Sequence, residues 1–250
     1  MKKTLFASDF HLGIPSADGS RLREKKIVNW LTKYQKEVDE IYFLGDVFDF
    51  WFEYKRAIPK GYSRLFGKLA ELADAGVALY FFKGNHDMWM FDYFEKEFGA
   101  TIISNELEKE IKGKKFYIHH GDGLGPGDTS YKFLKKFFRS GFCQWLFARL
   151  HPNFGIGIAQ YFSNRSRLAK GQILADQGAN KEAIQIYFKE LDRSNTADFY
   201  LCGHRHLPIE MTLPNGGKYI NTGDWFFHYT YALFDGTNLT LREYEENLIA

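Results

Sequence analysis

Histidine, aspartate and asparagine side chains, which commonly bind divalent cations, gather in five short clusters along this chain of 250 residues. No cluster contains cysteine, so the ligands on offer are carboxylate, amide and imidazole rather than thiolate. That mixture suits Mn²⁺, Fe²⁺ or Zn²⁺ bound through oxygen and nitrogen. The clusters are Asp9-Phe10-His11, Gly45-Asp46-Val47-Phe48-Asp49, Gly84-Asn85-His86-Asp87, His119-His120-Gly121-Asp122 and Gly203-His204-Arg205-His206.

Together the clusters offer more ligands than a single cation needs. Residues two apart in an extended segment face the same side, so Asp9 and His11 can point at one ion. The same spacing lets His204 and His206 share a face. An excess of ligands predicts two ions that share a bridging carboxylate, an arrangement suited to displacement at phosphorus.

Each cluster also has a purely structural interpretation when it is considered alone. Gly-Asp-x-x-Asp can cap a helix, His-Gly-Asp can contain a buried core histidine, and Gly-His-Arg-His can be a solvated loop. Gly-Asn-His-Asp is more informative, because turn formation accounts for its Gly and Asn but not for His86. All five clusters follow predicted strands in order, and this favours the dinuclear metal centre.

The predicted secondary structure explains how distant clusters can meet. Apolar strands are expected at 4–8, 41–44 and 77–82, with helices of amphipathic spacing at 21–34 and 63–75. Alternating strands and helices favour a parallel sheet with helices on both faces. The loops at the carboxyl ends of such strands gather at one edge and build the site.

The second half of the chain predicts further short strands around a helical insertion. The strands are expected at 107–111, 115–120, 198–202, 209–213, 218–220, 229–234 and 239–244. Residues 128–193 are predicted to be helical, with breaks at Pro152 and at Gly155 and Gly157. We therefore expect an α/β fold, a two-sheet sandwich formed by 1–127 and 194–250, with 128–193 as a helical lid that binds substrate.

Composition separates this lid from the rest of the chain. Residues 128–193 contain 11 Lys and Arg against 5 Asp and Glu, whereas the whole chain has a net charge of only +2. Aromatic residues are also concentrated between 131 and 162. A basic, aromatic lid can enclose acyl chains and meet phosphates or an anionic bilayer. The alternative is that these aromatic rings only pack the lid against itself and the body.

Other sequence features limit the cellular location and the kinds of partner that this protein can have. The near-neutral net charge gives no overall signature of nucleic-acid binding, so we expect no nucleic-acid partner. Cys143 and Cys202 form no motif, which favours a reducing compartment. Asp9 interrupts the first apolar run too early for a signal peptide, and no apolar stretch approaches about 18 residues. We expect a cytoplasmic protein in peripheral contact with the inner membrane surface.

The ordered set of five clusters resembles the calcineurin-like metallophosphoesterase superfamily over residues 9–206. The resemblance implies a four-layer αββα sandwich and two divalent ions, for which we expect Mn²⁺, with Fe²⁺ or Zn²⁺ as alternatives. It implies that Asp9, His11 and His206 bind one ion, that Asn85, His120 and His204 bind the other, and that Asp46 bridges them. Metal-bound hydroxide would then attack phosphorus directly, with His86 as general acid or electrostatic stabiliser. Asp49 or Asp87 would orient a histidine.

Within the superfamily, the chain is similar to the UDP-2,3-diacylglucosamine hydrolase family of lipid A biosynthesis. The similarity rests on chain length, on Trp51 after the second cluster, on the helical insertion and on Gly223-Asp224-Trp225. It implies hydrolysis of a pyrophosphate in a nucleotide-linked lipid, giving UMP and 2,3-diacylglucosamine 1-phosphate. It also implies substrate contacts from His86, Asp128, Asn164, Arg165, Arg167 and Lys170. The best-known members have Arg at the position of His86 and Thr at the position of Arg205.

Three other functions are compatible with the same fold. A relative acting on another soluble or lipid phosphoester would use the same metal centre, but a soluble substrate would not require such an apolar lid. A nuclease is disfavoured by the low net charge. A non-catalytic scaffold of this fold should have lost metal ligands, whereas all seven are present.

Overall fold

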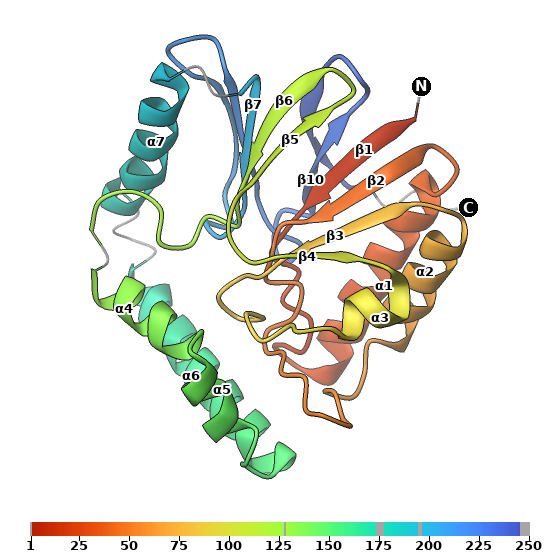
Figure 1. The fold of residues 1–250 in the computed structure, drawn as a ribbon, viewed down its shortest axis with the longest axis vertical. Helices are drawn as coiled ribbons and strands as arrows, with labels where there is room; N and C mark the ends of the chain where they lie inside the picture. Colours follow the sequence, from red (N-terminus) through yellow and green to blue (C-terminus); the bar gives the residue numbers. More distant parts are fainter. Residues whose placement is uncertain (1, 128, 174–177, 195–196, 246–250) are drawn as a thin grey trace.

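The computed structural model describes residues 2–127, 129–173, 178–194 and 197–245, and it describes residues 162, 164–173 and 178–182 by their backbone alone. Two β-sheets lie face to face, and helices cover their outer surfaces (Figure 1). The layers follow the order helix, sheet, sheet, helix. The expected α/β sandwich is therefore confirmed.

The first sheet has the strand order β11-β10-β1-β2-β3-β4. Its strands are β1 (Lys3–Ala7), β2 (Val38–Phe43), β3 (Ala78–Phe82), β4 (Thr101–Ile103), β10 (Thr230–Phe234) and β11 (Leu239–Glu243). Strands β1 to β4 are parallel, as the alternation of strands and helices predicts, and β10 pairs with β1 in antiparallel orientation. Helices α1 (Ala17–Tyr34), α2 (Ser63–Asp74) and α3 (Tyr93–Phe98) cover its outer face (Figure 1).

The second sheet has the order β5-β6-β7-β9-β8. Its strands are β5 (Leu107–Ile111), β6 (Lys114–Ile118), β7 (Phe199–Cys202), β8 (Pro208–Thr212) and β9 (Lys218–Thr222). Helix α7 (Gly178–Arg193) covers this sheet, because buried Ile184 and Phe188 pack with Tyr117 and Tyr200. Helix α7 is thus the fourth layer of the sandwich. We therefore propose that the lid, predicted at 128–193, ends before this helix.

Three helices project from the sandwich at the lower left of Figure 1. They are α4 (Thr129–Phe138), α5 (Gly141–Phe147) and α6 (Pro152–Ile173). Pro152 begins α6, where its missing N–H costs nothing, but the predicted break at Gly155 and Gly157 is wrong. Gly155 has a packing role, because a Cβ there would lie 2.9 Å from the Tyr54 hydroxyl and 3.0 Å from the Phe147 ring.

Aromatic packing fixes the two sheets relative to each other. The Phe6 ring of β1 lies 4.9 Å from that of Tyr42 and 5.6 Å from that of Phe116 in the second sheet, measured between centroids. All three side chains are almost fully buried. Densely packed interiors resist deformation, so the ends of β1, β2 and β6 are held at defined positions, and predicted ligands follow each of those ends.

Candidate metal centre

Most of the predicted ligands have an unusual backbone conformation. Five of the seven have positive φ angles, with Asp9 at 56°, His11 at 43°, Asp46 at 53°, His204 at 68° and His206 at 53°. Residues other than glycine rarely adopt this left-handed conformation, and such residues concentrate at functional sites. Each of these residues follows β1, β2 or β7, so the chain leaves the strand sharply and aims its side chain into a common space.

The first group of side chains consists of Asp9, His11 and His206. Asp9 Oδ1 lies 3.3 Å from His206 Nε2 and 3.7 Å from His11 Nε2. The two Nε2 atoms lie only 3.1 Å from each other. The structure therefore brings the three residues that were expected to bind the first ion to one point.

The second group consists of Asp46, His120 and His204. His120 Nε2 lies 3.5 Å from Asp46 Oδ2 and 3.2 Å from Asn85 Oδ1, so Asn85 adjoins the same space. Asp46 Oδ2 is also 3.8 Å from His11 Nε2 of the first group. Asp46 thus lies between the two groups, in the position expected of a bridging carboxylate.

The hydrogen bonds of Asp9 show that this arrangement fits a cation. Asp9 Oδ2 accepts hydrogen bonds from Ser8 Oγ and from the His204 backbone N–H. Asp9 Oδ1 is buried, and among the described residues no donor forms a hydrogen bond to it. A buried carboxylate oxygen without a donor is costly. A divalent cation bound by oxygen and nitrogen ligands would satisfy it.

The two predicted supporting carboxylates have different partners. Asp49 Oδ1 lies 3.5 Å from His11 Nδ1 and 3.4 Å from His86 Nδ1, a geometry that suits the orientation of histidines. The Asp87 carboxylate instead accepts backbone N–H groups of Gly84 (2.9 Å), Asp46 (3.2 Å) and Val47 (2.8 Å). Asp87 therefore ties together the loops that carry Asn85 and Asp46. Burial and the Asp46 charge raise the pKa of Asp87 to about 7.

His86 lies at the border of the metal centre. Its backbone N–H donates to Asp46 Oδ1 at 2.8 Å, and its Nδ1 lies 3.0 Å from the Asp49 carbonyl oxygen. Its side chain is 18% exposed, so part of the ring faces solvent. His86 can also form a three-ligand group with His11 and Asp46. The geometry thus permits His86 to act on a substrate or to bind a cation.

Two further acidic residues adjoin the ligands and were not selected from the sequence as site residues. Asp224 Oδ2 lies 3.4 Å from Nδ1 of His206. Asp122 Oδ2 accepts from the Tyr131 hydroxyl at 2.7 Å and pairs with Lys135 Nζ at 2.7 Å, which joins the metal loop to α4. Asp224 follows β9 directly after a glycine, so the strand-end pattern that identified the five clusters could also have identified it.

Mutual interactions among these buried groups set their pKa values. Burial would lower the pKa of His11, but the nearby Asp49 and Asp9 carboxylates raise it to about 9. Burial would also lower the pKa of His120, but the negative charge of Asp46 raises it to about 10. Burial would raise the pKa of Asp9, but His206 and His11 lower it to about 2. In the metal-free protein at neutral pH, the two imidazoles therefore carry protons beside ionised carboxylates.

We expect metal binding to release protons, because a cation must displace the protons on His11 and His120. Because both pKa values are raised, the two imidazoles stay protonated, and protons compete with the cation, up to a pH of about 9 to 10. Affinity for Mn²⁺ should increase as the pH rises from 6 toward 9. Calorimetric titration in buffers of different ionisation enthalpy measures the released protons. An Mn²⁺ affinity that is constant over this range would contradict the expectation.

The residues predicted to contact substrate lie mostly outside the described part of the chain. Asp128 is not described, and neither are the side chains of Asn164, Arg165, Arg167 and Lys170. The neighbouring Ser163 is described, and its Oγ donates to Asp49 Oδ2 at 3.0 Å. Helix α6 therefore meets the metal centre at Ser163, where the predicted basic segment begins.

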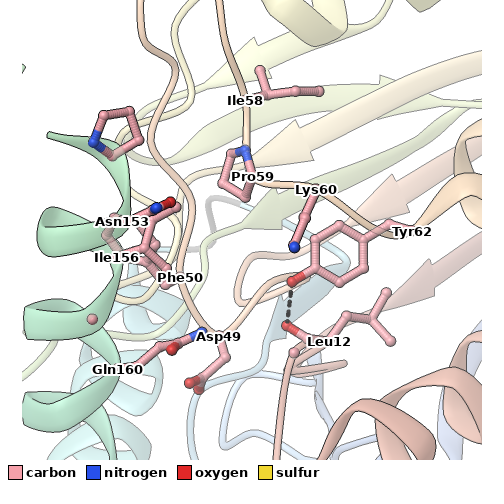
Figure 2. A pocket seen from close by; sticks show the side chains of 13 residues that line it. Leu12, Asp49, Phe50, Ile58, Pro59, Lys60, Tyr62, Asn153, Ile156 and Gln160 are labelled. Carbon is pink, nitrogen blue, oxygen red and sulfur yellow. Dashed lines mark hydrogen bonds between the residues drawn. The ribbon is translucent and has the colours of Figure 1, made fainter.

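A cavity of about 510 Å³ separates α6 from the loops of the sandwich. Figure 2 shows its lining, with Asn153, Ile156 and Gln160 on the helix side and Leu12, Asp49, Phe50 and Tyr62 among the residues opposite. Most of the lining is apolar, while amide groups, Lys60 and Asp49 supply polar atoms. Because Asp49 contacts His11 and His86, the cavity adjoins the metal centre.

The aromatic side chains of the projecting helices have two different environments. Phe147 packs against Phe52 and Trp89, with ring centroids 4.8 and 4.6 Å apart, so it joins α5 to the sandwich. Others remain largely exposed, including Phe133 at 75%, Phe142 at 66% and Trp145 at 53%. Packing alone therefore does not account for the aromatic content. In the described part of the chain, no helix is both long and apolar enough to cross a membrane.

Comparisons by family profile, by sequence and by structure all relate this chain to phosphoester-cleaving proteins. The family profile of calcineurin-like phosphoesterases matches residues 2–208. The chain is 36% identical to a UDP-2,3-diacylglucosamine hydrolase of Porphyromonas gingivalis, over 98% of both chains. It is 31% identical to a protein of the same name from Proteus mirabilis, over 86% of both chains. A solved archaeal phosphodiesterase has a similar fold, with a TM-score of 0.50, 12% identity, and coverage of 96% of this chain and 98% of that one.

Proposed function

Because the chain belongs to the calcineurin-like phosphoesterase family, we propose that it hydrolyses the pyrophosphate bond of UDP-2,3-diacylglucosamine. The products are UMP and 2,3-diacylglucosamine 1-phosphate. The protein is a metal-dependent hydrolase of α/β sandwich fold. The observation that carries the substrate is the 36% identity to a relative of that name over 98% of the chain, since this length includes α4 to α6 as well as the metal loops.

We propose two metal ions and assign Mn²⁺ to them. Asp9, His11 and His206 hold the first, Asn85, His120 and His204 hold the second, and Asp46 belongs to both. Divalent cations supply Lewis acidity to phosphate oxygens and lower the pKa of water. The support is the convergence of these side chains at the strand ends, together with an Asp9 oxygen that is buried without a hydrogen-bond donor.

The proton that the leaving phosphate oxygen requires is assigned to His86. The Asp49 carbonyl oxygen at 3.0 Å and carboxylate at 3.4 Å both face its Nδ1 and orient the ring. The exposed part of the ring then faces the substrate and donates a proton or a hydrogen bond there. Asp87 contributes by holding the backbone of the loops that carry Asp46 and Asn85.

The lid formed by α4 to α6 is proposed to bind the substrate and to determine its selection. The cavity beside Asp49 offers an apolar space for part of an acyl chain. Asn164, Arg165, Arg167 and Lys170 follow Ser163 on α6, which is hydrogen-bonded to Asp49, so their helix is anchored where the phosphates react. These residues and Asp128 are proposed to contact the nucleotide and diphosphate.

The exposed face of the same helices is proposed to contact the cytoplasmic surface of the membrane. Phe133, Phe142 and Trp145 are more than half exposed. Lys132 and Lys136 lie on α4, and Arg149 lies in the turn after α5, with its guanidinium 4.5 Å from the Trp145 ring centroid. Aromatic rings insert at the boundary between headgroups and acyl chains, and each basic residue adds about 1 kcal/mol at an anionic surface. We therefore propose a cytoplasmic protein that takes its substrate from the bilayer.

The proposed function is tested by turnover of the Mn²⁺-reconstituted protein. UDP-2,3-diacylglucosamine is compared with a panel of soluble phosphoesters, with release of UMP measured for the lipid and release of the hydrolysis product measured for each soluble substrate. We expect kcat/KM for the lipid to exceed that for every soluble substrate by several orders of magnitude. If a soluble phosphoester is hydrolysed as well as the lipid, the protein is a phosphoesterase with another substrate. Absence of turnover on all substrates with metal bound would indicate a scaffold.

Filling the cavity should weaken the reaction of the lipid selectively. Gly157 lines the cavity, and a Cβ at this position would meet no atom within 4 Å, so Gly157→Phe introduces a ring without a backbone clash. We expect KM for the long-chain lipid to rise about tenfold or more, because one displaced acyl segment is worth a few methylene groups at about 0.8 kcal/mol each. Hydrolysis of a small phosphodiester should be unchanged.

The matched control for this variant is Gly67→Phe. Gly67 lies in α2, away from the cavity, and its Cβ position is equally open. Equal losses in both variants would indicate a general effect of an added aromatic ring. Unchanged KM for the lipid in Gly157→Phe would remove the acyl chain from this cavity.

A further inference from the structure

The turn after β9 is built around one buried carboxylate, Asp224, whose side chain is fully shielded from solvent. Its Oδ1 accepts three backbone N–H groups, from Phe226 at 3.0 Å, Phe227 at 2.7 Å and His228 at 2.9 Å. The residue after it, Trp225, donates its backbone N–H to the Asp9 carbonyl oxygen at 3.2 Å. The turn is therefore attached to the loop that carries the first metal group.

The second oxygen of Asp224 is directed at two histidines. Oδ2 lies 3.4 Å from His206 Nδ1 and 3.5 Å from His228 Nδ1. It is buried, and within the described part of the chain it has no closer hydrogen-bond donor. A carboxylate only accepts hydrogen bonds, so the proton of each imidazole is favoured on Nδ1. For His206 this leaves Nε2 unprotonated toward Asp9 Oδ1, 3.3 Å away.

His228 lies at the rim beside His206. Both Nδ1 atoms contact the same oxygen, so they lie within about 7 Å of each other. The Nδ1 of His228 is buried, yet its side chain is 39% exposed, so the exposed part is the opposite edge of the ring, which carries Nε2. The Phe226 ring packs under the Arg23 guanidinium at 4.3 Å, which fixes the turn from the other side.

We propose that Asp224 is a positioning residue that keeps His206 in the tautomer that binds a cation through Nε2, and that presents His228 to the substrate at the same rim. The inference rests on the proposed metal-dependent function, but it assigns roles to Asp224 and His228 that the metal ligands do not require. A carboxylate that serves only as a turn cap would use Oδ1 alone. Here the second oxygen reaches two imidazoles, and the nearer one belongs to the first metal group.

The test replaces Asp224 by its isosteric amide. In Asp224→Asn, an amide oxygen at the Oδ1 position can still accept the three backbone N–H groups, so the melting temperature should change little. The amide nitrogen then meets His206 Nδ1 and favours the tautomer with a proton on Nε2. We expect Mn²⁺ affinity, followed by electron paramagnetic resonance, to fall about 10–100-fold, with activity restored by excess Mn²⁺.

Asp192→Asn is the matched control. Asp192 lies in α7 and is almost fully buried, like Asp224. It accepts the backbone N–H groups of Asn215 at 2.6 Å and Gly217 at 3.2 Å, in the turn between β8 and β9. Its variant should bind Mn²⁺ like the natural protein. His228→Gln should also bind Mn²⁺ normally, while KM for the phosphoester rises about tenfold, the loss of one hydrogen bond to a charged group.

The outcomes separate this inference from the proposed function. If the natural protein binds no Mn²⁺, the proposed function fails. If it binds Mn²⁺ and Asp224→Asn binds it equally well, the positioning role is overturned. If Asp224→Asn does not fold, ¹⁵N resonances of the histidines in the Cd²⁺-loaded natural protein decide. Coupling of cadmium to His206 Nε2 supports the proposal, whereas coupling to Nδ1 overturns it.

Discussion

Replacing Asp46 with alanine is expected to remove more bound metal than any other single substitution and to reduce turnover strongly. Asp46 Oδ2 lies 3.5 Å from His120 Nε2 and 3.8 Å from His11 Nε2, so it contacts both ligand groups. Cations stabilise transition-state charge by several kcal/mol, and each 1.36 kcal/mol is a factor of ten in rate. We expect a loss of about 10³-fold or more, with metal content measured by elemental analysis.

Two variants support the interpretation of this result. Asp46→Asn can still accept the His86 backbone N–H, which donates to Oδ1 at 2.8 Å, and so separates loss of charge from loss of loop structure. Asp74→Ala removes an exposed carboxylate at the end of α2 and should leave metal and activity unchanged. An Asp46→Ala protein with normal metal occupancy and normal turnover would exclude the bridging role.

The central strands and the fold class could be predicted because they depend on local patterns. Strands β1 and β3 and the second half of β2 are apolar runs that end shortly before a glycine or a polar cluster, and β5 occupies the predicted residues. Helix α3 and strand β4 were not predicted, because six and three residues are too few to show a period. Their existence depends on pairing of β4 with β3 and on burial of Phe94 and Phe98.

Long-range packing also explains the error in α6. Glycine is a weak helix former, so Gly155 and Gly157 predict a break from local preference alone. In the structure Gly155 faces the Phe147 ring and the Tyr54 hydroxyl, where any side chain would be too large. The absence of a Cβ therefore serves contact between the lid and the sandwich, which no local pattern reveals.

The ligand groups could be predicted, whereas the roles of the carboxylates around them could not. Each ligand follows a strand, so its position is encoded within a few neighbouring residues. Asp49 and Asp87 have equivalent positions in the sequence, in that each follows a predicted ligand by two or three residues. Their different partners, imidazoles for Asp49 and backbone N–H groups for Asp87, depend on how the loops fold together. Asp224 also follows a strand, but its contact with His206 depends on how the two loops fold together.

His86→Ala is expected to keep both metal ions and to lose turnover by about 10²–10⁴-fold, the usual contribution of a proton-transfer group. The reason is its place between the Asp46 carboxylate, which accepts its backbone N–H, and Asp49, which faces its Nδ1. The backbone hydrogen bond does not depend on the side chain, so the Asp46 loop should keep its conformation. Metal content and single-turnover rates measure the two effects separately.

The control and the contrary outcome follow from the second arrangement that the geometry permits. His151→Ala removes an exposed imidazole near the start of α6 and should leave the rate on a small phosphodiester unchanged. His86 can also share a cation with His11 and Asp46. If His86→Ala loses one ion and recovers its activity with excess Mn²⁺, His86 is a metal ligand rather than the proton donor. If the variant retains both ions and remains inactive at every Mn²⁺ concentration, the His86 ring acts on the substrate rather than on a cation.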